Sequence, residues 1–200
     1  MSDAGQKMKD MNGKWVDLST TKEPYRVEGK KTMGFEIVEQ LGWEVPDAII
    51  CPTGGGTALI GIWKAMDELE GIGAIGNERP RLYAAQSGNC APIVHAIEKG
   101  LDMLEPWSDP HTEALGLRVP SPFAGRLILS SIRRSGGSAV AVAENEIKPT
   151  QMMAARMEGV MMGPEAAVGL AGLRNLVEAG DIDFDEEVVL LNTGTNLRYT

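Results

Sequence analysis

Three consecutive glycines between two threonines form the run of residues best suited to chemistry in this sequence. They are Thr53, Gly54, Gly55, Gly56 and Thr57. Because glycine carries no Cβ, the backbone N–H groups of such a run can converge on one anion, and a helix that starts at its end adds about half a positive charge. The two threonine hydroxyls can supply further donors. The run therefore predicts a cradle for a small phosphate group, with a plain tight turn as the alternative.

Two other polar positions are candidates for the same site. Thr193 lies in a glycine-containing turn directly after an apolar run, where its hydroxyl can bond a ring heteroatom or simply cap the turn. Glu165 follows Pro164 at a predicted helix start, and its carboxylate suits either the helix dipole or an active site. His95 and His111 have no partners at metal-ligand spacing, so we expect no metal. The glycine run has neither the Gly-Lys-Thr ending of a P-loop nor the Gly-x-Gly-x-x-Gly pattern, which argues against a nucleotide.

A strand must precede the glycine run and a helix must follow it. Residues 48–52 form a short apolar run typical of a buried strand, and residues 57–69 have the spacing of a helix. A methionine-rich stretch, 152–162, precedes the helix that begins at Gly163. The other expected elements are an extended segment within 1–30, helices at 31–41 and 92–99, one ending near Arg134, one ending near Ala179, and strands at 82–86, 138–143 and 187–192. Strands that alternate with helices predict an α/β fold with three layers, in which a mostly parallel sheet carries helices on both faces.

The composition argues against a nucleic-acid-binding, a disulfide-stabilised or a membrane-spanning protein. The chain has 200 residues and a formal net charge of -9, so it can bury a sizeable core and is unsuited to binding nucleic-acid phosphates. Its two cysteines, Cys51 and Cys90, predict free thiols in a reducing compartment rather than a disulfide framework. No signal-peptide pattern opens the chain, and no apolar run approaches the ~20 residues of a membrane span. We therefore expect a cytoplasmic protein with no nucleic-acid or membrane partner.

Five segments of the chain, taken in order, resemble the pyridoxal-phosphate enzymes of the tryptophan-synthase-β fold type, and most closely the threonine synthase family. The segments are 18–34, 52–57, 116–120, 164–167 and 191–199. The resemblance implies pyridoxal 5'-phosphate as cofactor, with its phosphate on the backbone of Gly54 to Thr57 and its pyridine nitrogen facing the Thr193 hydroxyl. Thr53 and Glu165 complete the cofactor-binding set that it implies. The implied reaction converts an amino-acid phosphate, O-phosphohomoserine, and water to threonine and phosphate.

The chain departs from this family in its lysines. The family's Schiff-base lysine lies in a Ser-x-Lys segment upstream of the glycine run, and no such segment is present here. The lysines before the run lie in polar surroundings rather than in an apolar pocket, and they are Lys7, Lys9, Lys14, Lys22, Lys30 and Lys31. The catalytic lysine is therefore assigned to none of them. The resemblance thus implies that residues 1–200 are the carboxyl-terminal part of an enzyme, without the amino-terminal part that carries the lysine.

Three functions remain open at this point. The leading one is a threonine-synthase-like carbon–oxygen lyase, in which case we expect the isolated chain to be inactive. A second is another enzyme of the same fold type, either a threonine or serine dehydratase or an amino-acid ammonia-lyase. A third is a non-catalytic remnant that binds phosphate or a partner. We expect self-association, or a complementing amino-terminal half as partner, because half of an enzyme leaves apolar surface exposed.

Overall fold

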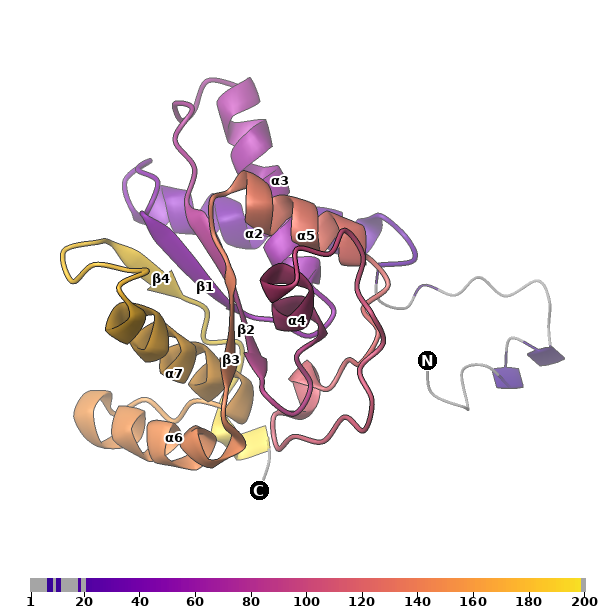
Figure 1. The fold of residues 1–200 in the computed structure, drawn as a ribbon. Helices are drawn as coiled ribbons and strands as arrows, with labels where there is room; N and C mark the ends of the chain where they lie inside the picture. The colour runs from indigo at the N-terminus through magenta and orange to yellow at the C-terminus, as the bar shows by residue number, and fades with distance from the viewer. Residues whose placement is uncertain (1–6, 9, 12–17, 19–20, 199–200) are drawn as a thin grey trace.

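Four parallel strands form a single sheet at the centre of the molecule (Figure 1). The structure, a computed structural model, describes residues 7–8, 10–11, 18 and 21–198. The strands are β1 (Ala48–Pro52), β2 (Arg81–Ser87), β3 (Ala139–Val142) and β4 (Val188–Leu190), in the spatial order β3-β2-β1-β4. All three neighbouring pairs are parallel. The predicted α/β fold with a mostly parallel sheet is therefore confirmed.

Helices cover both faces of this sheet (Figure 1). One layer contains α2 (Tyr25–Gln40), α3 (Thr57–Gly71), α4 (Pro92–Glu98) and α5 (Gly125–Arg134). The other layer contains α6 (Glu144–Glu158) and α7 (Pro164–Ala179). Two short 3-10 helices are also present: η1 (Leu115–Leu117) lies between α4 and α5, and η2 (Asn196–Arg198) follows β4. The three predicted layers are present.

β1 lies inside the sheet, between β2 and β4, and this position explains why its sequence is an unbroken apolar run. Ile49 and Cys51 pack into the core on the side of α3 and α5, while Ala48 and Ile50 pack into the core on the side of α7. A strand covered on both faces needs apolar side chains at every position rather than at alternate ones. The carboxyl end of β1 is thereby held firmly, and it leads directly into the glycine run.

Two parts of the chain differ from the prediction. The helix predicted from Lys31 begins at Tyr25, with Pro24 as its N-cap, so this part of 1–30 is helical rather than extended. Most of the remaining segment, including 12–17, lies outside the described residues. The methionine-rich stretch falls largely within α6, a helix that the prediction did not include. α6 buries Ile147, Thr150 and Ala154 but leaves several methionines exposed, so its sequence lacks a clear apolar stripe.

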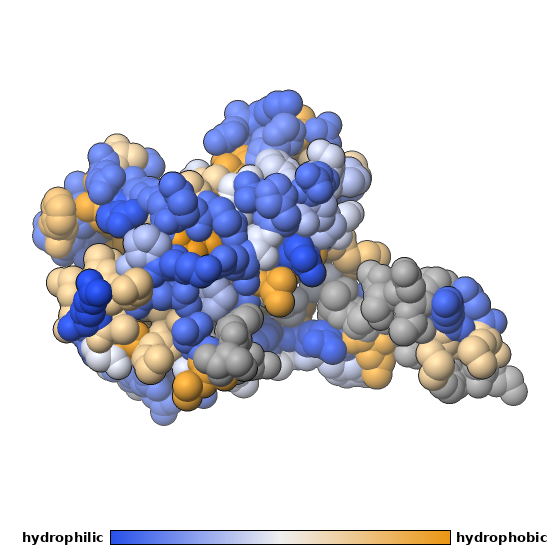
Figure 2. Space-filling view, turned by 90° about the horizontal axis from the view of Figure 1, so that it is seen from below, coloured by the Kyte–Doolittle hydropathy of each residue, from blue (hydrophilic) through white to orange (hydrophobic). Residues whose placement is uncertain are grey.

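The surface of the molecule carries hydrophobic residues in several separate places. Figure 2, which views the molecule from the lower side of Figure 1, shows them lying between hydrophilic residues. Within the part of the chain that the structure describes, no helix is both long and apolar enough to cross a lipid bilayer.

Candidate functional site

The glycine run forms the connection between β1 and α3. Gly56 is the N-cap of α3 and has a φ of 76°, in the left-handed region that favours glycine. A Cβ on Gly54 would lie 2.5 Å from the Gly116 carbonyl oxygen, and a Cβ on Gly56 would lie 2.3 Å from Cδ1 of Ile128. Gly55 has open space at that position, with no atom within 4 Å. Two of the three glycines are therefore required by close packing, and the third faces free space.

The backbone donors of this run are available to a ligand. Among the described residues, no acceptor is present for the N–H groups of Gly54, Gly55, Gly56 or Thr57. No side chain caps the start of α3. Unpaired N–H groups at the positive end of a helix are the arrangement that binds phosphate. The geometry of the run fits the predicted phosphate cradle.

Thr53 supports the cradle in a different way from the one predicted. Its side chain is buried, and its hydroxyl donates a hydrogen bond to the Cys51 carbonyl at 2.6 Å. Its backbone N–H donates to the Ala85 carbonyl at 2.8 Å. Both donors of Thr53 are thus directed into the sheet, so the prediction that its hydroxyl would serve an anion is wrong for this structure. Thr53 instead anchors the start of the run to β2.

A cavity of about 400 Å³ lies at the carboxyl end of the sheet, beside this run. Its walls come from the end of β1, from η1, from the start of α7 and from the turn after β4. The lining residues are Pro52, Gly54, Gly116, Leu117, Glu165, Thr193 and Gly194. The structure therefore brings together Gly54, Glu165 and Thr193, which were predicted to share a site. Gly116 and Leu117 were not predicted as site residues, although they lie within one of the five resembling segments.

Glu165 joins two walls of the cavity. It is 8% exposed, and its Oε1 accepts a hydrogen bond from the Gly116 N–H at 2.8 Å. Because the Gly116 carbonyl in turn packs against Gly54, the carboxylate holds η1 against the glycine run. The position of Glu165 in the first turn of α7 also places its negative charge at the positive end of that helix. The capping role and the site role that were predicted as alternatives are both compatible with this geometry.

Hydrogen bonds from the start of α7 and from α6 hold the turn that carries Thr193. The Gly163 N–H donates to the Gly194 carbonyl at 2.8 Å, and Met162 forms an isolated antiparallel bridge with Thr195. Gln151 of α6 donates from Nε2 to the Met162 carbonyl at 2.9 Å. These bonds fix the turn at the rim of the cavity, where Thr193 itself is exposed and able to meet a ligand.

No group of three or more His, Cys, Asp and Glu side chains in the described part of the chain could hold a metal ion. Cys51 and Cys90 are free and buried, and burial raises the pKa of the Cys51 thiol to about 12.

Among the lysines, Lys31 pairs with Glu68 at 2.8 Å and Lys148 pairs with Glu113 at 2.8 Å. The cavity lining contains no lysine, and Lys9 and Lys14 lie outside the described residues.

A second cavity reaches the end of the glycine run at Thr57. It has a volume of about 320 Å³ and is lined by Arg26, Gly29, Lys30, Thr32, Met33 and Thr57. Two cationic side chains thus lie beside the first residue of α3. The sequence prediction did not include Arg26 as a site residue, and it considered Lys30 only as a candidate for the catalytic lysine.

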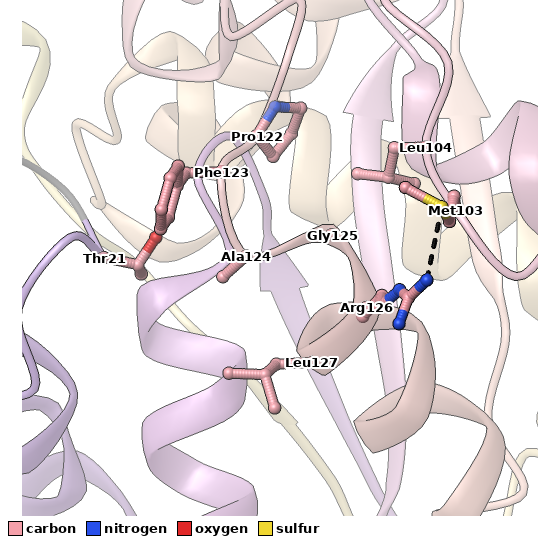
Figure 3. Close-up of a pocket in the computed structure, with 9 residues that line it drawn as sticks. All are labelled: Thr21, Met103, Leu104, Pro122, Phe123, Ala124, Gly125, Arg126 and Leu127. Atoms are coloured by element: carbon pink, nitrogen blue, oxygen red, sulfur yellow. Dashed lines mark hydrogen bonds between the residues drawn. The ribbon is translucent and has the colours of Figure 1, made fainter.

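A third cavity is apolar and separate from both. Its volume is about 360 Å³, and it lies where the segment between α4 and α5 meets the start of α5 (Figure 3). Figure 3 shows Phe123 and Thr21 facing each other on one side, with Met103 and Leu104 on the other. Arg126 donates from Nη2 to the sulfur of Met103 at 3.5 Å across its rim. The cavity offers little for orienting a polar ligand.

Comparison with known proteins identifies the class of enzyme to which this fold belongs. The model of the family described as pyridoxal-phosphate dependent enzyme matches residues 2–194, so the chain belongs to this family. The threonine synthase of Methanocaldococcus jannaschii is 39% identical over 185 residues, which are 92% of this chain and 45% of that protein. The threonine synthase of Methanosarcina acetivorans is 41% identical over 183 residues, with the same two shares. The chain spans about half the length of the curated relatives it matches.

Solved structures share the fold. A threonine deaminase from Solanum lycopersicum superimposes with a TM-score of 0.74 at 20% identity, covering 96% of this chain and 51% of that chain. The serine racemase of Dictyostelium discoideum gives a TM-score of 0.64 at 24% identity, covering 85% and 50%. At such identities the likeness concerns the fold alone. Together with the threonine synthases, it confirms the resemblance inferred from the five segments.

Pyridoxal 5'-phosphate is the cofactor of this family, and the residues of this chain fit it. The N–H groups of Gly54 to Thr57 provide donors without acceptors in the described structure, which suit the phosphate. The adjoining cavity has the volume for a small ring, and Thr193, which carries a hydroxyl, is one of its lining residues. Glu165 closes the same cavity from the side of α7.

Proposed function

We propose that this chain is the phosphate-binding part of a threonine-synthase-like carbon–oxygen lyase. The reaction converts O-phosphohomoserine and water to threonine and inorganic phosphate. The proposal is supported by threonine synthases that are 39% and 41% identical to nearly the whole chain. Since the chain spans about half of those relatives, the proposal concerns the enzyme to which these residues contribute.

The residues of the first cavity divide the task of holding the cofactor. The backbone N–H groups of Gly54 to Thr57 bind the phosphate, and the Thr193 hydroxyl meets the pyridine nitrogen. Glu165 keeps η1 in place as a wall of the cavity through its bond to Gly116. When bound, the cofactor supplies an electron sink that eases proton removal from substrate carbon atoms. A neutral hydroxyl at the pyridine nitrogen tempers that sink, because it does not favour protonation as a carboxylate would.

The second cavity is the observation that favours a phosphorylated substrate. Arg26 and Lys30 line it together with Thr57, at the positive end of α3. Two cations and a helix start suit an anion directly beside the glycine run. Nε of Arg26 also donates to the Leu18 carbonyl at 3.0 Å and lies 3.8 Å from the Glu23 carboxylate, so its remaining guanidinium N–H groups are the donors proposed for that anion. A leaving phosphate bound there has its developing negative charge stabilised. A dehydratase or ammonia-lyase acting on an unphosphorylated amino acid has no use for such a site.

Binding of the substrate phosphate tests this proposal. In phosphorus NMR titrations with O-phosphohomoserine, we expect Arg26→Gln to weaken binding by about tenfold, the cost of one charge-assisted hydrogen bond. Arg174→Gln is the matched control, because Arg174 pairs with Glu146 on the opposite helical layer and lines neither cavity. Equal affinity of the original chain for homoserine and O-phosphohomoserine, measured by calorimetry, would refute the phosphorylated substrate and favour a dehydratase.

We further propose that the Schiff-base lysine comes from polypeptide outside these residues, either a complementing amino-terminal half or another copy of the enzyme. The absence of lysine from the described residues that line the first cavity supports this. After incubation with pyridoxal 5'-phosphate and reduction with borohydride, mass mapping is expected to find no single modified lysine. A persistent adduct at one lysine of this chain would contradict the proposal and assign the catalytic residue.

A further inference from the structure

A buried polar side chain near the glycine run, that of Gln86, lies at the carboxyl end of β2. Gln86 is fully buried, with 0% exposure. Its Nε2 donates to the Thr53 carbonyl at 3.0 Å, and its Oε1 accepts from the Ile93 N–H at 2.8 Å and the Val94 N–H at 3.3 Å. One amide side chain therefore links the residue before the glycine run to the start of α4.

The bonds to α4 fix the orientation of this amide. Ala91, the N-cap of α4, provides no side-chain acceptor, and Pro92 follows it at the first helical position. Oε1 of Gln86 takes the place of the missing cap, because Ile93 and Val94 occupy the positions whose N–H groups an N-cap side chain normally satisfies. With the oxygen committed to α4, the NH₂ group must face Thr53. A donor thus points at the Thr53 carbonyl for a structural reason.

We infer that Gln86 is a positioning residue for the cofactor phosphate, and that its bond to Thr53 sets the direction in which the N–H groups of the glycine run point. This inference rests on the proposed cofactor role of that run. The peptide that carries the Thr53 carbonyl also carries the Gly54 N–H, so a bond to the oxygen orients the first donor of the cradle. The other polar groups of Thr53 are already bonded to Cys51 and Ala85. Gln86 controls the remaining polar group of that residue.

The substitution Gln86→Glu separates the two halves of this contact. The carboxylate retains an acceptor for α4, whose positive end favours the charge, but it removes the donor to Thr53. Gln86→Met removes both the donor and the acceptor and replaces them with an apolar side chain of similar size. It is the second variant to test if the buried charge of Gln86→Glu prevents folding. Ser135→Ala is the matched control. The Ser135 hydroxyl is also buried and bonds to the backbone of β2, but at Leu82 and therefore at the opposite end of the strand.

The readout compares two probes that lack an aldehyde and so do not react with lysines, namely pyridoxine 5'-phosphate and pyridoxine. Calorimetry gives the ratio of their dissociation constants for each chain, and thermal melting reports folding. We expect the original chain to prefer the phosphorylated probe. In both Gln86 variants that preference falls about tenfold, equivalent to about 1.4 kcal/mol, while pyridoxine binding is unchanged. Ser135→Ala lowers the melting temperature and keeps the preference.

The possible outcomes separate the inference from the function on which it rests. If folded Gln86→Glu and Gln86→Met chains keep the original preference, Gln86 does not position the cradle, and the cofactor role of the glycine run stands. A preference lost equally in Ser135→Ala means that general loosening of β2 is responsible, which also overturns the inference. If the original chain shows no preference for the phosphorylated probe, the proposed cofactor role of the glycine run is wrong, and the inference about Gln86 is then wrong as well.

Discussion

Gly55 and Gly56 are neighbours in the glycine run, but the structure places them in different surroundings. Gly56 has a φ of 76° and lies against Ile128, whereas Gly55 has ordinary φ and open space around it. An alanine at a left-handed position costs about 1–2 kcal/mol, before any rearrangement of Ile128. We therefore expect Gly56→Ala to reduce the free energy of unfolding by about 1–3 kcal/mol.

Gly55→Ala is the internal comparison for that measurement. We expect its free energy of unfolding, from urea titration followed by tryptophan fluorescence, to stay within about 0.5 kcal/mol of the original. Equal losses in the two variants would mean that the conformation of Gly56 carries no special energetic demand.

The two cysteines allow a second prediction at the scale of the residue. Both are buried, and burial raises the pKa of Cys51 to about 12 and that of Cys90 above its usual value. Since the thiolate is the reactive form, we expect neither cysteine to react with iodoacetamide in the folded chain at neutral pH. In denaturant both should react, as counted by mass spectrometry. Rapid labelling of either one under native conditions would contradict the burial described here.

Sequence alone singled out Gly54, Thr193 and Glu165, which the structure brings together around one cavity, because each lies directly after a strand or at a helix start. Their cofactor-binding role stays a prediction. Sequence alone did not identify Gln86 or the role of Thr53. Gln86 lies inside a predicted strand, and its partners Thr53 and Ile93 belong to other elements. A bond of this kind depends on which strands are neighbours in the sheet, and local pattern does not reveal strand order. Arg26 was not identified for the same reason, because it lines the second cavity together with Thr57, which belongs to a different helix, α3.

At the scale of elements, α2 and α3 are joined by a four-member ion cluster. Lys31 lies 2.5 Å from Glu28 and 2.8 Å from Glu68, and Lys64 pairs with the same two carboxylates. The hydrogen bond from Lys31, and then that from Lys64, lowers the pKa of Glu28 below its usual 4.5. A lowered carboxyl pKa stabilises the fold above pH 4.5, and this contribution is lost as the pH falls through the folded-state value.

The variant Glu28→Gln should therefore lower the urea midpoint at neutral pH, by a small amount because the cluster is exposed to solvent. The difference from the original chain should shrink and vanish as the pH falls well below 4.5. Glu36→Gln, on the same helix, is the control and should have little effect at either pH. A Glu28→Gln difference that persists in acid would show that packing rather than charge is responsible.

The elements themselves were predictable to different degrees. β1 and α3 have sharp signals, namely an apolar run, glycines and then helical spacing. α6 was missed because its exposed methionines, such as Met152 and Met157, obscure the apolar stripe, and because Pro149 lies within it. Its place is determined by packing against α7 rather than by its own periodicity. The early start of α2 at Tyr25 likewise follows a proline N-cap that looked like part of an extended segment.

For the whole molecule, the apolar cavity of Figure 3 is the feature with consequences for behaviour in solution. Phe123 on its rim is 68% exposed, and Met103 and Leu127 are also exposed. Such surface favours association. We expect the chain to form dimers or larger species in light scattering, and Phe123→Ser to shift it toward the monomer.

Phe184→Ser is the matched control for this prediction. Phe184 is 96% exposed in the segment before β4, and it is not among the residues that line the cavity of Phe123. This substitution should leave the association unchanged. A chain that is monomeric at all concentrations, or one that responds only to Phe184→Ser, would show that this surface does not mediate contact.

The strand order β3-β2-β1-β4 places the last strand of the chain beside the first. The Glu187 N–H that donates to the Asp47 carboxylate at 2.8 Å is 140 residues away from it in sequence. The loop after β1 and the turn after β4, which both line the first cavity, therefore meet only when the chain from β1 to that turn is present. During synthesis on the ribosome, β1 must remain with one side unpaired until β4 emerges, so premature termination before Val188 leaves a bare sheet edge that invites misassembly. The first cavity therefore forms only after β4 has joined the sheet beside β1.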